Sequence, residues 1–545
     1  MAATQQQHLR RWQRDAFDIY LARLANAAGT PARAPSVLWE ATPGAGKTTA
    51  ALTLCKHQKE VAQARRIVVV VPTTHLKLQW SRAAHRHGIQ LDYRFSEANR
   101  APASDFDGIV VTYQQIGNRP QAFARLSKDA TVVLDEVHHA ADGLTWGDSL
   151  RRAFRPARFI LCLSGTAFRS DNNTIPFVTY DEHGVSQPDY VYSYADAISE
   201  RVCRPTVFFT YGGEVGWTDG GVEVQAAFND ALDRTDRTKR LRAALDPSSG
   251  WIEPMLRDAN EMVSAVRREH PTAAGLLVAS SQNHARMLAK VLRDISGKRP
   301  VVVLSDDAAS TEKLKTFQQS DEPWLVACNM VSEGVDIPRL RVGVYATTIR
   351  TKMYFRQFLG RIVRRTPTPR GPQSAFCYLP ADPWLRTLAE EIEEEQRHQV
   401  FAKAEDPFPE RDEEARERKE PVESTWRPTR GFNRGVDAVI MGGSQLTLWG
   451  GPQNDYEDSP IREIEPVSSA GAHHEQAALS RAELKEEIVK EIRSLVSRYH
   501  IHSGQPFNHI HTLLNRKQSV KSQQNCTEEQ LRERLHLLQD LLHKR

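Results

Sequence analysis

The feature that most constrains this chain is a series of short, uninterrupted apolar runs separated by polar stretches long enough to hold helices. Such runs recur between about residues 35 and 170, and a second set lies between about residues 273 and 380. Continuous Val, Ile and Leu runs are typical of strands buried on both faces, and long connections between them are typical of parallel sheets. The sequence therefore predicts an α/β fold with two parallel-sheet domains in tandem.

At 545 residues the chain is long enough for several domains. The stretch 386–420 carries 13 acidic against 7 basic side chains, and polar residues, Pro and Gly then dominate to about residue 475. We expect an N-terminal helix at 1–34, a first sheet domain at 35–200, a connector at 201–255, a second sheet domain at 256–385, an acidic and polar linker, partly disordered, at 386–475, and a small C-terminal helical module at 476–545.

The overall charge is nearly balanced, with 72 Lys and Arg against 68 Asp and Glu, which excludes a strongly basic nucleic-acid coat protein. No apolar run approaches the length of a membrane helix, so we expect no membrane partner. The six cysteines lie far apart without a C-x-x-C pair, which argues against a disulfide framework or a zinc ribbon. A reducing, cytoplasmic setting is the simplest interpretation.

A glycine-rich segment follows the first apolar run and matches a phosphate-binding loop, with Ala41 in the place of the first glycine. Small residues let backbone N–H groups approach the phosphates of ATP, and Lys47 reaches the β- and γ-phosphate oxygens. The hydroxyl of Thr48 would bind Mg²⁺ at the N-terminus of the following helix. The predicted nucleotide-binding residues of this loop are Thr42, Pro43, Gly44, Ala45, Gly46, Lys47, Thr48 and Thr49.

Two adjacent carboxylates follow a later buried run, in the segment TVVLDEVHH. Asp135 stands where a strand would end and can hold Mg²⁺ through water, while Glu136 can orient and deprotonate an attacking water molecule. An acidic turn is the plain alternative for Asp-Glu alone, but the phosphate loop upstream favours a catalytic pair. His138 fits a coupling or γ-phosphate contact better than a metal ligand.

These motifs, with Ser164-Gly165-Thr166 and the segment QFLGRIVR at 357–364, occur in an order that resembles the superfamily 2 helicases and translocases of the DExH branch. The resemblance covers about residues 9–380, and it is strongest to bacterial and phage repair, recombination and restriction-type members. It implies two RecA-like domains with a cleft between them, and ATP with Mg²⁺ as cofactors.

The resemblance also assigns further residues position by position. Gln13 is similar to the glutamine that reads adenine, and Ser164, Gly165 and Thr166 resemble the segment that couples hydrolysis to domain movement. Gly334 and Asp336 lie in a loop similar to one that contacts the nucleotide. Residues that resemble the loops gripping the nucleic-acid backbone are Pro72, Thr73, Thr74, Thr112 and Tyr113.

Gln357, Arg361 and Arg364 stand at spacings of four and three, which would place them on one face of a single helix. The resemblance makes Arg361 and Arg364 arginine fingers that neutralise the charge of the γ-phosphoryl group in the transition state. A basic surface helix is the alternative.

The C-terminal module is predicted from two capping signatures, Ser480 with Glu483 and Thr527 with Gln530, each before a helical apolar pattern. Four histidines between 500 and 511 have no cysteine or carboxylate at a familiar spacing, so a metal site there is disfavoured. The module could bind duplex phosphates or a protein partner.

The functional hypothesis is an ATP-dependent helicase or translocase with DNA as the more probable partner than RNA. Two alternatives stay open: an RNA helicase, and a nucleic-acid sensor or assembly subunit that uses ATP as a switch and recruits an effector such as a nuclease.

Overall fold

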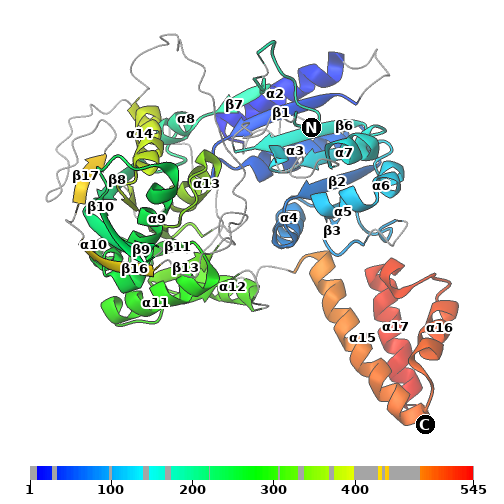
Figure 1. The fold of residues 1–545 in the computed structure, drawn as a ribbon. Helices are drawn as coiled ribbons and strands as arrows, with labels where there is room; N and C mark the ends of the chain where they lie inside the picture. Colours follow the sequence, from blue (N-terminus) through cyan, green and yellow to red (C-terminus); the bar gives the residue numbers. More distant parts are fainter. Residues whose placement is uncertain are drawn as a thin grey trace. The chain divides into compact units, whose positions relative to one another are not determined.

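The chain divides into two compact units, which are described separately (Figure 1). Unit 1 comprises Met1–Glu40, Gly46–Val191 and Tyr456–Arg545, and unit 2 comprises Ala41–Ala45 and Tyr192–Asp455. The computed structural model describes residues 9–26, 34–96, 101–138, 146–165, 174–183, 185–219, 221–304, 307, 309–328, 337–366, 373–397, 427–432, 436–440 and 479–543.

Unit 1 contains a seven-stranded sheet of order β3-β4-β2-β5-β6-β1-β7. The pairs from β3 to β1 are parallel, which confirms the prediction from the uninterrupted apolar runs. The second strand along the chain, RIVVVV, is buried at five of its six positions, as expected of a strand covered on both faces. The strands are β1 (Ser36–Ala41), β2 (Arg66–Val71), β3 (Leu91–Asp92), β4 (Gly108–Thr112), β5 (Ala130–Leu134), β6 (Phe159–Ser164) and β7 (Tyr190–Tyr192).

Helices connect these strands, and the parallel register aligns the carboxyl ends of β1, β5 and β6 at one edge of the sheet. Of all the helices that the structure describes, none combines the length and apolar character needed to cross a membrane. The helices between the strands of unit 1, with the helix that precedes them, are α2 (Arg11–Asn26), α3 (Lys47–Glu60), α4 (Thr74–Arg86), α5 (Tyr113–Asn118), α6 (Pro120–Leu126) and α7 (Trp146–Phe154).

Unit 2 contains a second seven-stranded sheet, of order β12-β13-β11-β14-β15-β8-β17, which is parallel except at β17. We expected residues 201–255 to form a connector between the two sheet domains, but β8 (Thr206–Tyr211) pairs with β15 in this second sheet. All six residues of β8 are buried, so its apolar TVFFTY run is a core strand. The other strands are β11 (Ala274–Ala279), β12 (Val301–Val303), β13 (Trp324–Cys328), β14 (Leu340–Ala346), β15 (Ala375–Pro380) and β17 (Val436–Ile440).

A smaller antiparallel sheet of order β10-β9-β16 also belongs to unit 2. It joins a hairpin, β9 (Glu214–Asp219) with β10 (Val222–Ala227), to β16 (Arg427–Phe432). Both β16 and β17 fall within 386–475, which we predicted as linker, so part of that region supplies edge strands to unit 2. The helical elements of unit 2 are α8 (Tyr194–Ser199), α9 (Arg234–Leu245), the 3₁₀ turn η3 (Pro247–Ser249), α10 (Ile252–Glu269), α11 (Gln282–Ser296), α12 (Ser310–Gln319), α13 (Lys352–Ile362) and α14 (Pro383–Arg397).

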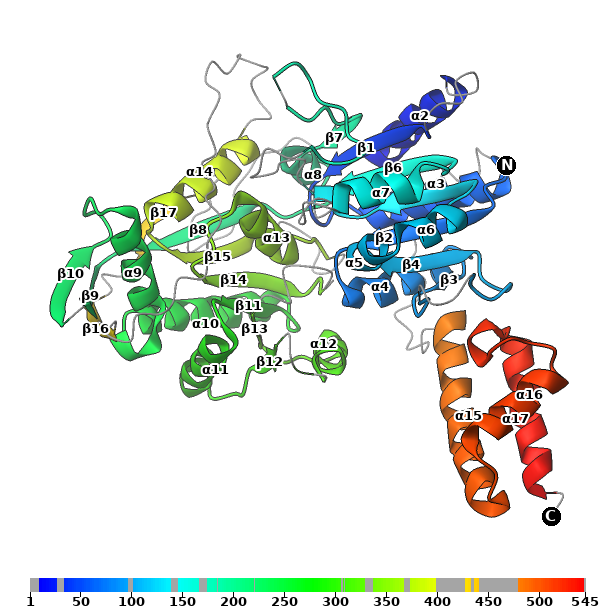
Figure 2. The same cartoon turned by 45° about the vertical axis from the view of Figure 1, so that its right-hand side comes forward.

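The C-terminal residues form the predicted helical module (Figure 2). Its own apolar core is built on residues such as Ile492, Leu514 and Leu538. Both capping signatures are confirmed: Ser480 and Glu483 form a capping box, and Thr527 and Gln530 exchange two hydrogen bonds. The module consists of α15 (Arg481–Ser503), α16 (Phe507–Lys517), the 3₁₀ turn η4 (Gln523–Asn525) and α17 (Glu528–His543).

Ion pairs and hydrogen bonds hold this module against the first sheet domain, within unit 1. Arg82 on α4 donates from Nε and Nη2 to Glu483 Oε1 at 2.9 and 2.7 Å. Lys485 Nζ lies 3.2 Å from Asp105 Oδ1, and the backbone N–H of Glu528 donates to Asp105 Oδ2 at 3.0 Å. Asp105 therefore neutralises Lys485 and stands at the positive end of the α17 dipole.

Arg204, which has no exposed surface, joins several segments of unit 2. Its guanidinium donates to the carbonyl oxygens of Leu340 (2.9 Å), Ile362 (3.2 Å) and Pro338 (3.3 Å), and to the side chains of Gln373 and Thr366. Leu340 begins β14 and Ile362 ends α13, so one side chain fixes both elements. Among the side chains, only the planar guanidinium group of arginine has enough N–H donors, in a fixed geometry, to reach all of these acceptors.

We expect Arg204→Met and Arg204→Lys to destabilise unit 2 by about 3 kcal/mol or more, because buried carbonyl groups lose their donors. Arg204→Lys keeps the charge but cannot span the same acceptors. Urea denaturation measures both changes. The control is Arg257→Met, which removes a 59 % exposed side chain from an i,i+4 pair and should shift stability by about 0.5 kcal/mol at most. Equal, small effects at both positions would contradict the assigned role of Arg204.

Candidate active site

The phosphate-loop segment lies between β1 and α3. Gly44 (φ +88°) and Gly46 (φ +94°) adopt left-handed backbone conformations that a side chain would strain. Gly46 is the N-cap of α3 and provides no side-chain cap, and Lys47, Thr48 and Thr49 form the first turn of the helix. A glycine-rich turn leading into an uncapped helix N-terminus suits a phosphate group, because the helix dipole there favours an anion.

Gln13, on α2, lies directly over this turn. Its Nε2 donates to the carbonyl oxygen of Gly46 at 3.1 Å, its Oε1 accepts from the backbone N–H of Arg10, and it is 4 % exposed. A Cβ built on Gly46 would come within 3.0 Å of Gln13 Nε2 and 3.5 Å of Arg10 Nη1. The structure thus brings Gln13 to the phosphate loop, and it adds Arg10, which no sequence motif had identified.

Asp135 follows β5 at the same edge of the sheet and is held by two aromatic side chains. Trp80 on α4 donates from Nε1 to Asp135 Oδ2 at 2.7 Å, and the hydroxyl of Tyr113 donates to the Asp135 carbonyl oxygen at 2.9 Å. Trp80 is 1 % exposed. No local sequence pattern indicated that its indole N–H meets a carboxylate.

Glu136 adopts φ +49°, a conformation that costs a residue with a side chain about 1 kcal/mol or more. Its carboxylate is held on two sides: Lys47 Nζ lies 3.3 Å from Oε1, and the backbone N–H of Gly165 donates to Oε2 at 3.1 Å. Burial, with the Glu136 charge beside it, raises the pKa of Asp135 to about 6. The two neighbouring carboxylates therefore differ in environment, as their separate predicted roles require.

The predicted coupling residues also meet. His138 Nδ1 lies 3.1 Å from Ser164 Oγ and 3.7 Å from Glu136 Oε2. Ser164 is fully buried and His138 is 4 % exposed. A contiguous set of side chains thus runs from Lys47 through Glu136 and His138 to the end of β6. Thr166 lies outside the described residues.

The residues predicted to grip nucleic acid occupy two neighbouring strand ends. Pro72, Thr73 and Thr74 connect β2 to α4, with Thr73 as the N-cap and Thr74 exposed. Thr112 ends β4 and forms a capping box with Gln115, and Tyr113 is 1 % exposed. The side chains of Thr112 and Tyr113 thus support α5 and Asp135 in this structure. The nucleic-acid role of all five residues stays a prediction.

We predicted that Gln357, Arg361 and Arg364 share one face of a single helix, and this prediction is wrong for Arg364. Gln357 and Arg361 lie on α13, but the helix ends at Ile362, and Arg364 forms an isolated β-bridge with Cys203. The helix stops because the carbonyl of Val363 accepts from the N–H of Arg204, and the N–H of Arg365 donates to Val202. Gly334 and Asp336 lie outside the described residues.

Within unit 2, Arg364 contacts the short phosphate-loop segment that belongs to that unit. A Cβ built on Gly44 would lie 3.2 Å from Arg364 Cγ, and one on Gly360 would lie 2.2 Å from Pro43 Cβ. Cys203 Sγ lies 3.9 Å from the Pro43 carbonyl oxygen. The close approach explains why α13 carries glycine at position 360.

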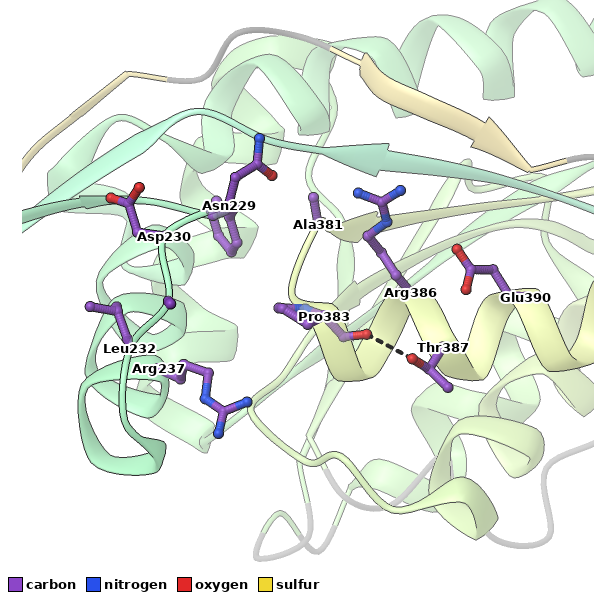
Figure 3. Close-up of a pocket in the computed structure, with 11 residues that line it drawn as sticks. Asn229, Asp230, Leu232, Arg237, Ala381, Pro383, Arg386, Thr387 and Glu390 are labelled. Atoms are coloured by element: carbon purple, nitrogen blue, oxygen red, sulfur yellow. Dashed lines mark hydrogen bonds between the residues drawn. The ribbon is translucent and has the colours of Figure 1, made fainter. Parts of the chain in front are cut away.

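A separate cavity of ≈ 540 Å³ lies elsewhere in unit 2, between the β10–α9 connection and the first turns of α14 (Figure 3). Asp230 and Arg237 line one side, and Arg386 and Glu390 line the other. Its two basic and two acidic side chains balance, and none of the predicted site residues lines it. It is therefore distinct from the site at the phosphate loop.

The chain is similar to several known proteins. Residues 5–169 match the family described as "Type III restriction enzyme, res subunit". The chain is 35% identical to the uncharacterized protein MT2985 of Mycobacterium tuberculosis, over 99% of this chain and 94% of the relative. It is 22% identical to the DNA 3'-5' translocase XPB2 of Sulfurisphaera tokodaii, over 59% of this chain and 73% of the relative.

The fragment of an HsdR subunit of a type I restriction enzyme from Vibrio vulnificus aligns with a TM-score of 0.47 and 18% identity. The alignment covers 70% of this chain and 65% of that fragment.

The contact between Trp80 and Asp135 can be measured with a double-mutant cycle. We expect Trp80→Phe and Asp135→Ala to show a coupling energy of about 1–3 kcal/mol in urea denaturation, because each alone leaves a buried polar group without its partner. Trp39→Phe is the matched control, since Trp39 is also fully buried and its Nε1 has no hydrogen-bond partner among the described residues. A coupling energy for Trp80 no larger than that for Trp39 would count against the bond.

Proposed function

We propose that this chain, which belongs to the family of the mycobacterial protein MT2985, is a superfamily 2 helicase-like protein and an ATP-dependent motor that steps along DNA. The observation that carries the proposal is the cluster at the carboxyl edge of the first sheet, where Lys47 lies 3.3 Å from Glu136 and Asp135 stands beside it. Residues that follow β1 and β5 supply this cluster, and Gly165 after β6 bonds to Glu136. A lysine on a glycine-rich loop next to two carboxylates is the arrangement that phosphoryl transfer needs.

The residues of unit 1 take separate roles in this proposal. The phosphate loop and Lys47 bind the phosphates, and Gln13 binds the adenine. Glu136 accepts the proton of the attacking water, and its contacts with Lys47 and Gly165 hold it in place for that role. His138 and Ser164 transmit the state of the site to the end of β6.

Thr48 and Asp135 would hold Mg²⁺, and the donor set fits that ion. A hydroxyl and a carboxylate are hard oxygen ligands, and Mg²⁺ usually keeps several waters beside one or two protein oxygens. Asp135 is 8 % exposed, and the hydrogen bond from Trp80 Nε1 to its Oδ2 atom orients the carboxylate. When bound, the ion supplies charge neutralisation at the phosphates.

Arg361 and Arg364 are proposed as the residues of unit 2 that neutralise charge on the γ-phosphoryl group. Support comes from the position of Arg364 beside Gly44 of the phosphate loop. The end of α13 at Ile362 gives the two arginines different backbone settings, so we expect them to act independently. Gln357 lies one helical turn before Arg361 and is proposed to position it or the attacking water.

DNA is proposed as the partner in preference to RNA. The relative from Sulfurisphaera tokodaii is by its name a DNA translocase, and the matching family is a restriction-enzyme subunit. Pro72, Thr73 and Thr74 are proposed to contact the strand, because they stand at the exposed start of α4.

We expect Lys47→Ala and Glu136→Gln to lower ATP turnover by about 10²–10⁴-fold, because one removes the phosphate ligand and the other the proton acceptor. Glu136→Gln should still bind a fluorescent ATP analogue, whereas Lys47→Ala should bind it weakly. Steady-state hydrolysis with and without single-stranded DNA measures turnover. Lys56→Ala changes another lysine of α3 and should behave as the wild-type chain does.

Matched DNA and RNA strands then separate the alternatives. Stimulation by DNA alone, with movement detected by displacement of a bound strand or a roadblock, supports the proposed motor. Stimulation by RNA alone would overturn the DNA assignment. ATP binding without movement, together with co-purification of a nuclease, would instead identify an ATP-switched assembly subunit.

A further inference from the structure

The C-terminal module has an uneven distribution of charge. Residues 492–527 contain five Lys or Arg and four His but no Asp or Glu. The acidic residues of the module lie outside this stretch, and two of them, Glu483 and Glu486, pair with the first sheet domain. Part of the acidic charge of the module is thus used in ion pairs with the domain, while 492–527 itself carries five positive charges and no negative one.

All five cations of this stretch are exposed, and in the part of the chain that the structure describes none of them pairs with a carboxylate. They are Arg493 and Arg498 on α15, Arg516 and Lys517 at the end of α16, and Lys521 in the connection to α17. Exposed cations that are not paired with a carboxylate attract phosphate groups.

The turn between α15 and α16 adds exposed apolar surface. Ile501 is 80 % exposed and Phe507 is 45 % exposed, which is unusual for large apolar side chains. Arg498, Ile501 and His502 share a helix face, since they are spaced by three and four residues. Phe507 stacks on His500 with ring centroids 4.2 Å apart, so its ring is held in one orientation.

From these observations we propose that residues 492–527 bind a single nucleic-acid strand, with the cations contacting phosphates and Phe507 stacking on a base. This inference rests on the proposed function and names a second strand-binding surface for the motor. Cations combined with exposed aromatic side chains are the features by which proteins bind single strands without sequence preference.

Charged residues attach the module to the first sheet domain. Arg82, which pairs with Glu483, lies on α4, the helix that begins at the proposed strand contact Thr74. Lys485 is 8 % exposed, pairs with Asp105 and lies 4.4 Å from the centre of the Phe106 ring. The module is therefore fixed to unit 1, which also carries the proposed strand contacts.

Binding of the full-length chain to a fluorescent single-stranded DNA tests the inference across a salt series. R498E/K517E should weaken binding by about tenfold or more at low salt and reduce the slope of log K against log salt by about 1.4. The control K128E/R155E reverses two exposed cations at the amino ends of β5 and β6 and should bind as the wild-type chain does.

Phe507→Ala should weaken binding by about tenfold at every salt concentration, and Phe507→Tyr should restore it, because stacking needs the ring rather than the charge. Wild-type affinity in both R498E/K517E and Phe507→Ala would overturn the inference. The proposed function would survive that result if DNA still stimulates ATP hydrolysis in the same variants. Absence of stimulation in the wild-type chain would instead refute the proposed function.

Discussion

The structure of the candidate site depends on the parallel hydrogen-bonded ladder of the first sheet. In that ladder β2, β5, β6 and β1 lie side by side with the same direction, so the residues after β1, β5 and β6 emerge at one edge. Lys47, Glu136 and Gly165 are far apart in the sequence, yet their atoms are within hydrogen-bonding or ion-pair distance. A parallel sheet produces this convergence because its strands run in the same direction, so the functional residues that follow them lie at the same edge.

Buried polar side chains that hydrogen-bond to other parts of the protein fix which segments lie next to one another in the interior. Asp135 would be costly to bury alone, and the indole N–H of Trp80 compensates part of that cost. Arg204 is a buried cation that bonds carbonyl oxygens and neutral side chains of unit 2. Both groups join elements distant in the sequence, so the positions of the site residues depend on hydrogen bonds as well as on apolar packing.

The charged residues of the C-terminal module also contact segments that are distant in the sequence. Its residues Glu483 and Glu486 pair with Arg82 and Arg94 of the first sheet domain, and Lys485 pairs with Asp105 of that domain. Five of its other cations are exposed on 492–527. A balanced total charge therefore conceals a local basic surface, and the pairing of the acidic residues within the fold is what reveals it.

The sequence by itself determined the α/β class, the strand runs, the phosphate loop, the pair Asp135 and Glu136, and both capping signatures of the module. These features are local: apolar runs, glycine positions and i,i+3 spacings act over a few residues. Only the tertiary structure decided that β8 joins the second sheet, that α13 ends before Arg364, and that Trp80 and Arg204 hold the site. Each of these depends on a hydrogen bond between segments distant in the chain, and no local pattern specifies which partner a buried polar group will meet.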